Sequence, residues 1–170
     1  GLGGRGSSLG VYVGVVEGLG ANPTPIPFGE VYQALVQGVV DGAENNYPSY
    51  EGTRHFEAAN HYSLTGHVMA PEVLVASRRS WEKMTNEEQA YLQAAATESV
   101  PIMRELWDTR VAKSRQRVLD YGVSIEDKVD RTAFAERMTP VWDRFISTPE
   151  MRSIVDDISA TRNVFGGADE

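Results

Sequence analysis

The stretch from Thr85 to Gly122 constrains this chain more than any other. Thr85 and Glu88 form a capping box, in which two side chains satisfy the first backbone N–H groups of a helix. We expect that helix to run as far as Leu119 and to stop at Gly122, with Pro101 as a kink or a break. Because such a long helix often ties two lobes together, the stretch favours a two-lobed chain.

Glycine and proline divide the rest of the sequence into short elements. Helical spacing of apolar residues predicts helices over 11–19, 29–38, 47–59 and 134–145, with another starting at Thr148-Pro149. Residues 21–28 carry three alternating prolines and should be extended. Strands are expected over VVDGAE (39–44) and VMAPEVLVAS (68–77), and GVSIED (122–127) is expected to be a short extended piece. This alternation is typical of an α/β fold.

The composition excludes several classes of partner. The chain has 170 residues, with 16 basic against 24 acidic residues and a net charge of −8, so nucleic acid and anionic membranes are disfavoured as partners. It has no uninterrupted apolar run near the roughly 18 residues needed to span a bilayer, so membrane insertion is not expected. It contains no cysteine, which excludes disulfides and thiolate chemistry.

Two further patterns point only weakly to chemistry. Glycines at positions 1, 3 and 6 match the spacing of a dinucleotide loop, but no strand precedes Gly1, and a phosphate loop needs a strand before it and a helix after it. An α/β enzyme with a nucleotide loop over residues 1–6 is kept as the alternative function. His55, His61 and His67 are six residues apart, which would turn each helical ligand about 120° from the last, and no cysteine or acid cluster completes a metal site.

The segment ENNYPSY places Asn45 and Asn46 between an expected strand and a helix whose first turn contains Pro48. Such amides often cap the helix. They also offer a donor and an acceptor to hydroxyl and carboxylate groups, at the end of a strand where open α/β folds bind ligands. From the residues alone, both interpretations stay open.

The stretch GANPTPIPFGEVYQALVQGVVDGAENNYPSYEGTRHFEAA and the following HYSLTGHVMAPEVLVAS resemble one known family. It is the DctP family, the extracytoplasmic solute-binding proteins of tripartite ATP-independent periplasmic (TRAP) transporters, and the resemblance runs from Gly1 to about Asp157. It implies a two-lobed α/β fold of the type II periplasmic-binding-protein kind. It also implies a periplasmic receptor that passes an organic acid to a membrane permease, with no catalysis and no cofactor.

The resemblance places a set of ligand-binding residues on this chain. Arg5 matches an arginine whose guanidinium group forks onto the ligand carboxylate, a geometry that lysine cannot reproduce. Asn45 matches an amide that helps to hold the same carboxylate, and Phe28 matches an aromatic wall of the cleft. Ser8 and Glu72 match positions that reach polar groups of the ligand. Asn46 and Tyr50 are adjacent candidates.

The resemblance also predicts the domain organisation and the class of solute. Residues 1–70 and 111–164 would build the second lobe, residues 71–110 would add a strand and a helix to a first lobe, and residues 165–170 would form a flexible tail. Members of the family are about twice as long, so we expect the N-terminal half to be missing here. An ionised Glu72 facing the cleft would repel a second carboxylate, which favours a sugar acid such as a uronate over a dicarboxylate.

Overall fold

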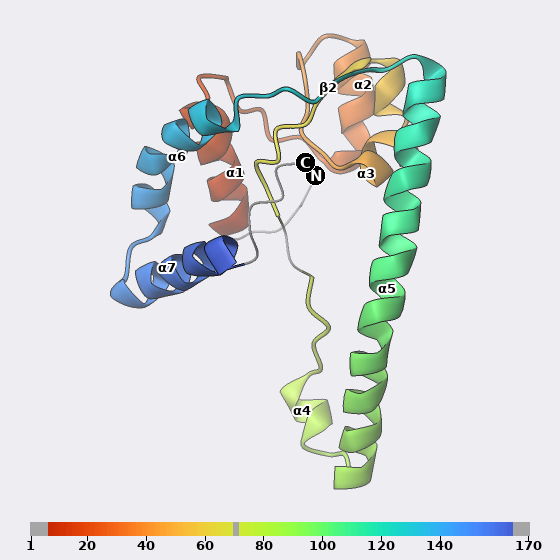
Figure 1. Cartoon of the computed structure of the whole chain (residues 1–170), viewed down its shortest axis with the longest axis vertical. Helices are drawn as coiled ribbons and strands as arrows, with labels where there is room; N and C mark the ends of the chain where they lie inside the picture. The colour runs from red at the N-terminus through yellow and green to blue at the C-terminus, as the bar shows by residue number, and fades with distance from the viewer. Residues whose placement is uncertain (1–6, 70–71, 165–170) are drawn as a thin grey trace. The chain divides into compact units, whose positions relative to one another are not determined.

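The computed structural model describes residues 7–69 and 72–164, and for residues 7–9 and 162–164 it describes the backbone alone. The chain forms two compact units, one from residues 1–28 with 130–170 and the other from residues 29–129. Figure 1 labels the α-helices of both units and strand β2. The expected tail over residues 165–170 lies outside the described residues.

The first unit consists of helices. They are α1 (Ser7–Gly18), α6 (Arg131–Phe145) and α7 (Pro149–Val164), which confirms the helices predicted in these regions. Helix α1 packs closely on α6 because glycines face the contact. A Cβ atom on Gly14 would lie 3.0 Å from the side chain of Phe145, and one on Gly18 would lie 2.9 Å from the side chain of Val141. Larger residues at either position would push the helices apart.

The second unit combines short helices, one long helix and a small sheet. Its elements are α2 (Val31–Val36), α3 (Tyr47–Gly52), η2 (His55–Glu57), β1 (His61–Ser63), α4 (Arg78–Trp81), α5 (Asn86–Tyr121) and β2 (Ser124–Glu126), preceded by η1 (Phe28–Glu30). Strands β1 and β2 are parallel, with Tyr62 opposite Ile125. Parallel neighbours need a long crossover connection, and α5 lies within it. The short extended piece predicted over GVSIED is confirmed, and within it Ser124–Glu126 form β2.

Helix α5 begins and ends where the sequence predicted. The backbone N–H of Thr85 donates to the carboxylate of Glu88 at 2.7 Å, and the backbone N–H of Glu88 donates to the Thr85 hydroxyl at 3.3 Å. At the other end, Gly122 has a φ of 102°, which glycine adopts without strain. The helix continues through Pro101 without a break. No helix within the described ranges is long and apolar enough to cross a bilayer.

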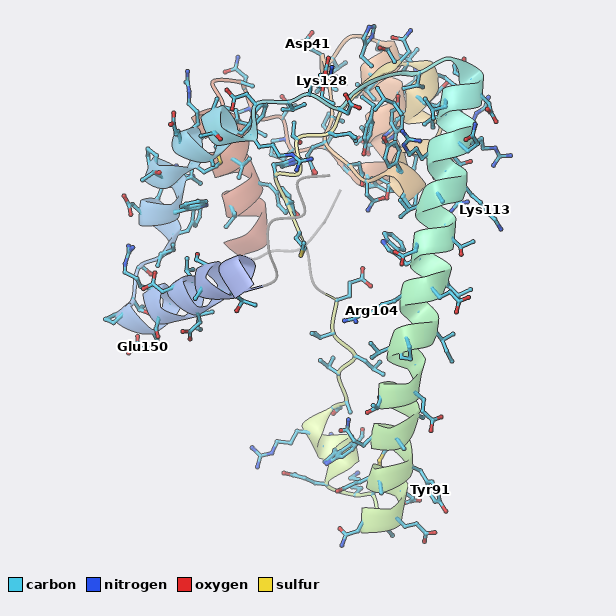
Figure 2. All side chains as sticks on the ribbon, viewed as in Figure 1. Asp41, Tyr91, Arg104, Lys113, Lys128 and Glu150 are labelled. Carbon is cyan, nitrogen blue, oxygen red and sulfur yellow. The ribbon has the colours of Figure 1, made fainter. Side chains whose placement is uncertain are left out.

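The core of the second unit lies at the C-terminal end of α5. It contains Tyr50, Phe56, Val118 and Val123, and the half-buried side chains Tyr47, Tyr62 and Ile125 pack against it. These residues come from α3, η2, α5, the two strands and the turn after α5. Figure 2 shows Lys113 near this end of α5 and Tyr91 near its start. Tyr91 is 67% exposed, so the core does not extend along the whole helix.

The two predicted strands are wrong. Residues 39–44 form turns and irregular backbone, and residues 68, 69 and 72–77 have no regular structure. Val73, Leu74 and Val75 are 77%, 82% and 79% exposed. A strand needs a neighbour for its backbone groups, and no described element pairs with this segment. Its apolar, β-branched composition therefore lacks the partner that would make it a strand.

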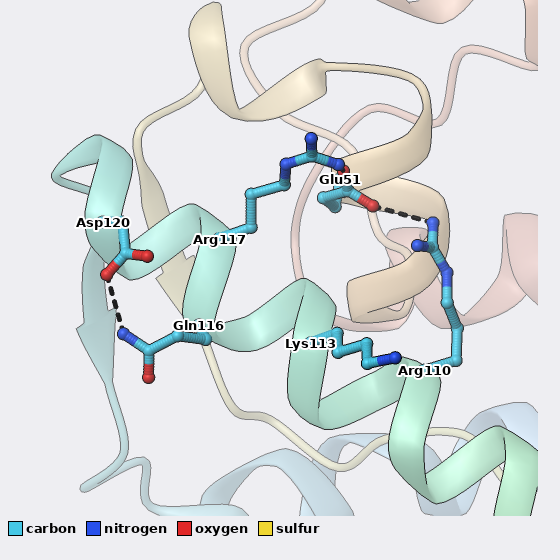
Figure 3. A pocket seen from close by; sticks show the side chains of 6 residues that line it. All are labelled: Glu51, Arg110, Lys113, Gln116, Arg117 and Asp120. Carbon is cyan, nitrogen blue, oxygen red and sulfur yellow. Dashed lines mark hydrogen bonds and ion pairs between the residues drawn. The ribbon is translucent and has the colours of Figure 1, made fainter.

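A buried carboxylate fastens α3 to α5. Glu51 of α3 is 6% exposed and accepts hydrogen bonds from Arg110 and Arg117, each at 2.7 Å (Figure 3). The two arginines are seven residues apart on α5 and so lie on the same face of the helix. They surround an open hollow of about 370 Å³, which is lined by Glu51, Arg110, Lys113, Gln116, Arg117 and Asp120. The Glu51 carboxylate in this hollow is already paired with two arginines, so the cluster joins α3 to α5.

Removing both arginines should destabilise the unit more than removing the acid does. In Arg110→Met/Arg117→Met the buried Glu51 carboxylate loses its counter-charges, which costs about 3–5 kcal/mol of unfolding free energy. In Glu51→Gln the arginines, whose side chains are 47% and 72% exposed, are left to water, so the loss should be smaller. Urea unfolding measures both.

The matched control is Arg78→Met. Arg78 pairs with Glu82 on the surface with its side chain 90% exposed, so its removal should change stability little. A double arginine variant as stable as this control would contradict the role given to Glu51.

Candidate functional site

Asn46 caps helix α3. Its side-chain oxygen accepts the backbone N–H of Ser49 at 2.9 Å, and its ψ of 164° is the extended conformation of an N-cap residue. A proline follows in the first turn of the helix, as the sequence suggested. The capping interpretation is therefore confirmed for Asn46, whose oxygen is used within the fold.

Asn45 uses its oxygen atoms within the fold. Its side-chain oxygen accepts the backbone N–H of Asn46 at 2.9 Å, and its backbone carbonyl accepts the Tyr62 hydroxyl at 2.6 Å. The bond from a backbone N–H identifies which atom of the amide is the oxygen, and so which is the NH₂ group of this half-buried residue. In the described part of the chain that NH₂ group makes no hydrogen bond. Asn45 can therefore offer two donors to an acceptor such as a carboxylate.

Aromatic rings lie directly behind these amides. Tyr47 and Tyr62 stack with 4.5 Å between ring centroids, Tyr50 lies 4.8 Å from Tyr62, and Phe56 meets Tyr50 edge-on at 6.1 Å. Burial raises the pKa of Tyr50 and of Tyr62 to about 12, because an ionised phenolate would lose its water. Both hydroxyls consequently stay protonated donors at neutral pH. The loop before α3 is therefore next to a cluster of packed aromatic side chains.

A second polar group adjoins Asn45. The Glu44 carboxylate lies 3.5 Å from the Nε2 atom of His67, and the Nδ1 atom of the same ring is 2.6 Å from the Thr65 hydroxyl. Gly66, between them, has a φ of 59° and allows the tight turn that brings His67 back to this loop. The loop before α3 is thereby linked to the segment after β1.

The other residues expected at the site are placed as follows. Arg5 lies outside the described residues, as do the glycines of the possible nucleotide loop. Ser8 lies in the first turn of α1, where the backbone alone is described. Phe28 is half-buried at the start of η1, and Glu72 is exposed in the irregular segment 72–77. Within the described structure, no hydrogen bond or ion pair joins Glu72 to Asn45 or Asn46.

The three histidines have three separate environments. His55 is 3% exposed in η2, and burial lowers its pKa. His61 contacts the side chain of Asn60 at 2.9 Å, and His67 contacts Thr65 and Glu44. In the described ranges no group of three or more histidine, aspartate or glutamate residues could hold a metal ion.

The profile of the DctP family, described as bacterial extracellular solute-binding protein family 7, matches residues 5–148. The chain belongs to this family. A curated solute-binding protein of Chromohalobacter salexigens is 44% identical over 149 residues, which cover 87% of this chain and 44% of that protein.

Solved structures of TRAP periplasmic solute-binding proteins match the same part of this DctP chain. One from Chromohalobacter salexigens, with bound D-glucuronate, has a TM-score of 0.83 at 44% identity and covers 88% of this chain and 50% of that one. One from a Bradyrhizobium species, in complex with galacturonate, has a TM-score of 0.79 at 48% identity and covers 87% and 49%. The fold is thus that of type II periplasmic binding proteins, and the chain spans about half the length of the relatives it matches.

Sequence analysis missed several residues that shape this site of the DctP chain. Tyr62, Glu44 and His67 contact Asn45 or its neighbour, and Glu51 fixes the helix that follows. The histidine spacing favours a helix-surface or capping role for His67 over a metal site, and it does not indicate the contact with Glu44. The sequence signal for this loop is the acid followed by an amide at positions 44 and 45. The sequence does not show that a distant aromatic side chain, Tyr62, reaches it.

The buried tyrosines should make the protein lose stability at alkaline pH. An unfolded tyrosine ionises near pH 10, whereas Tyr50 and Tyr62 resist ionisation until about pH 12 in the folded state. Between these values the unfolded state binds fewer protons, so the free energy of unfolding falls as pH rises. Below pH 10 the tyrosines should add no pH dependence.

Urea unfolding between pH 8 and pH 11.5 measures this slope. Tyr62→Phe should make the alkaline fall shallower, while Tyr91→Phe, which removes an exposed hydroxyl, should leave it as in the wild type. An identical slope in Tyr62→Phe and the wild type would contradict the burial argument.

Proposed function

We propose that this chain carries one half of the ligand site of a TRAP solute-binding receptor that binds a uronate. The observation that carries the proposal is the orientation of Asn45, whose amide has two N–H donors left for an acceptor. Receptors similar to this chain hold glucuronate or galacturonate, and each of these ligands has a carboxylate. An NH₂ group with two unused N–H donors can donate to that carboxylate.

The proposal assigns the main charge to Arg5. Its guanidinium group forks onto the carboxylate, and Asn45 donates to the same group. Phe28 packs against a face of the sugar ring, while Ser8 and the amide nitrogen of Asn46 serve hydroxyl groups. Asn46 takes only this lesser part because its oxygen already caps α3.

Glu72 is proposed to select against a second carboxylate. A carboxylate side chain accepts hydrogen bonds from sugar hydroxyls but repels an anion in a partly desolvated cleft. A uronate has one carboxylate and several hydroxyls, whereas succinate and malate each have two carboxylates. The exposure of Glu72 in segment 72–77 is compatible with a residue that meets its partners only in a closed, two-lobed protein.

We further propose that residues 71–110 belong to a first lobe, while residues 1–70 and 111–164 form the second. Val73, Leu74 and Val75 are exposed, and so are Leu92, Met103 and Leu106 along α5. This apolar surface is what an additional α/β lobe would cover. The share of each relative that this chain spans, about half, supports the assignment.

The family defines the wider role. DctP-family members are periplasmic solute-binding receptors rather than enzymes, and they work with membrane permease components. For this chain we propose the same: lobe closure on the acid, delivery to TRAP permease subunits, and release of an unchanged ligand without any cofactor.

A thermal-shift series with the full-length protein tests the proposal. Galacturonate, glucuronate or gluconate should stabilise the folded state by about 2.7 kcal/mol at a hundredfold excess over Kd, because a ligand that binds only the native state adds that free energy. Succinate and malate should stabilise it less. Stabilisation by the dicarboxylates alone would refute the role of Glu72, and stabilisation by NAD but by no acid would favour the nucleotide-dependent enzyme.

The same series with Arg5→Lys tests the clamp. Loss of the planar fork should weaken binding by about 1–3 kcal/mol although the charge remains. Arg78→Lys, a change at an exposed arginine that pairs with Glu82, should bind as the wild type does.

A further inference from the structure

The hydroxyl group of Tyr62 reaches the chain at Asn45. It donates a 2.6 Å hydrogen bond to the backbone carbonyl of that residue. The Tyr62 ring is held on two sides, by stacking on Tyr47 and by Tyr50 at 4.8 Å. Its strand β1 is paired with β2. The sheet and the core therefore determine where this hydroxyl lies.

The loop that carries Asn45 has few other attachments. The hydrogen bond between the Asn45 side chain and the Asn46 backbone is local and cannot fix the loop on the core. In the described part of the chain, residues 41–45 are joined to distant elements by the Tyr62 hydrogen bond and by the Glu44–His67 pair. The Tyr62 bond is the shorter of the two, and it acts on the residue whose amide NH₂ group makes no hydrogen bond in the described part of the chain.

We infer that Tyr62 is a positioning residue for ligand binding, which holds the Asn45 backbone so that its NH₂ group is directed at the ligand carboxylate. The inference rests on the proposed function, in which Asn45 donates to that carboxylate. A loop already held in its binding conformation loses less freedom when the ligand arrives, so affinity rises without any contact between Tyr62 and the ligand. Burial raises the pKa of Tyr62 to about 12, so the hydroxyl remains a donor well above neutral pH.

Tyr32 provides a matched control. Its hydroxyl also joins distant residues of the second unit, because it donates to the Glu57 carboxylate at 3.0 Å, but that carboxylate belongs to η2 and not to the loop that carries Asn45. Tyr62→Phe and Tyr32→Phe each keep the ring and remove one hydroxyl hydrogen bond, so both should cost stability. Calorimetric titration of the full-length protein with galacturonate should show affinity about fivefold weaker for Tyr62→Phe, as expected for one lost hydrogen bond. The affinity of Tyr32→Phe should stay within about twofold of the wild type.

A double variant separates positioning from a general structural effect. If Tyr62 acts through Asn45, Tyr62→Phe should weaken binding no further in an Asn45→Ala background. Equal affinities of wild type and Tyr62→Phe, or an undiminished effect of Tyr62→Phe in the Asn45→Ala background, would overturn the inference alone. Absence of binding to galacturonate and to every other acid of the series by the wild type would overturn the proposed function and this inference with it.

Discussion

The buried carboxylate of Glu51 holds α3 on α5, and α3 directly follows the loop in which we propose that Asn45 binds a ligand. Arg110 and Arg117 reach it from one face of α5, so α3 has a defined position on the long helix. The first turn of α3 is capped by Asn46, and Asn45 directly precedes that cap. The orientation of Asn45, the proposed donor to the ligand carboxylate, thus depends on the Glu51 ion pairs, which lie about one and a half turns further along the helix.

The aromatic base beneath the loop complements this anchoring. Glu51 fixes α3 to α5, while Tyr62 of β1, whose ring stacks on Tyr47 of α3, donates a hydrogen bond to the loop. The side-chain oxygens of Asn45 and Asn46 both accept hydrogen bonds within the fold, whereas the Asn45 amide nitrogen makes none in the described part of the chain. Pre-organised donors of this kind favour a ligand whose acceptors fit without rearrangement.

Local signals predicted most of the helices but not the two strands at 39–44 and 68–77. The helix expected over 47–59 is wrong in its length, because α3 ends at Gly52 and Arg54, with a φ of 60°, separates it from the short helix η2. The Thr85–Glu88 capping box and Gly122 set both ends of α5 because capping depends on neighbouring residues alone. Segment 68–77 has strand composition but no partner strand in the described structure, and a strand is stable only when its backbone is paired. For the site, the sequence identified Asn45 and Asn46. It could not identify Tyr62 as the partner of Asn45, because that contact joins residues 17 positions apart.

The direct measurement of the central claim is a crystal structure of the full-length protein with galacturonate. The account predicts that the Asn45 side-chain nitrogen lies at about 2.7–3.2 Å from a carboxylate oxygen of the ligand, while the side-chain oxygen still accepts the Asn46 N–H. A ligand whose carboxylate lies away from Asn45, or an Asn45 amide turned so that its oxygen faces the ligand, would contradict it.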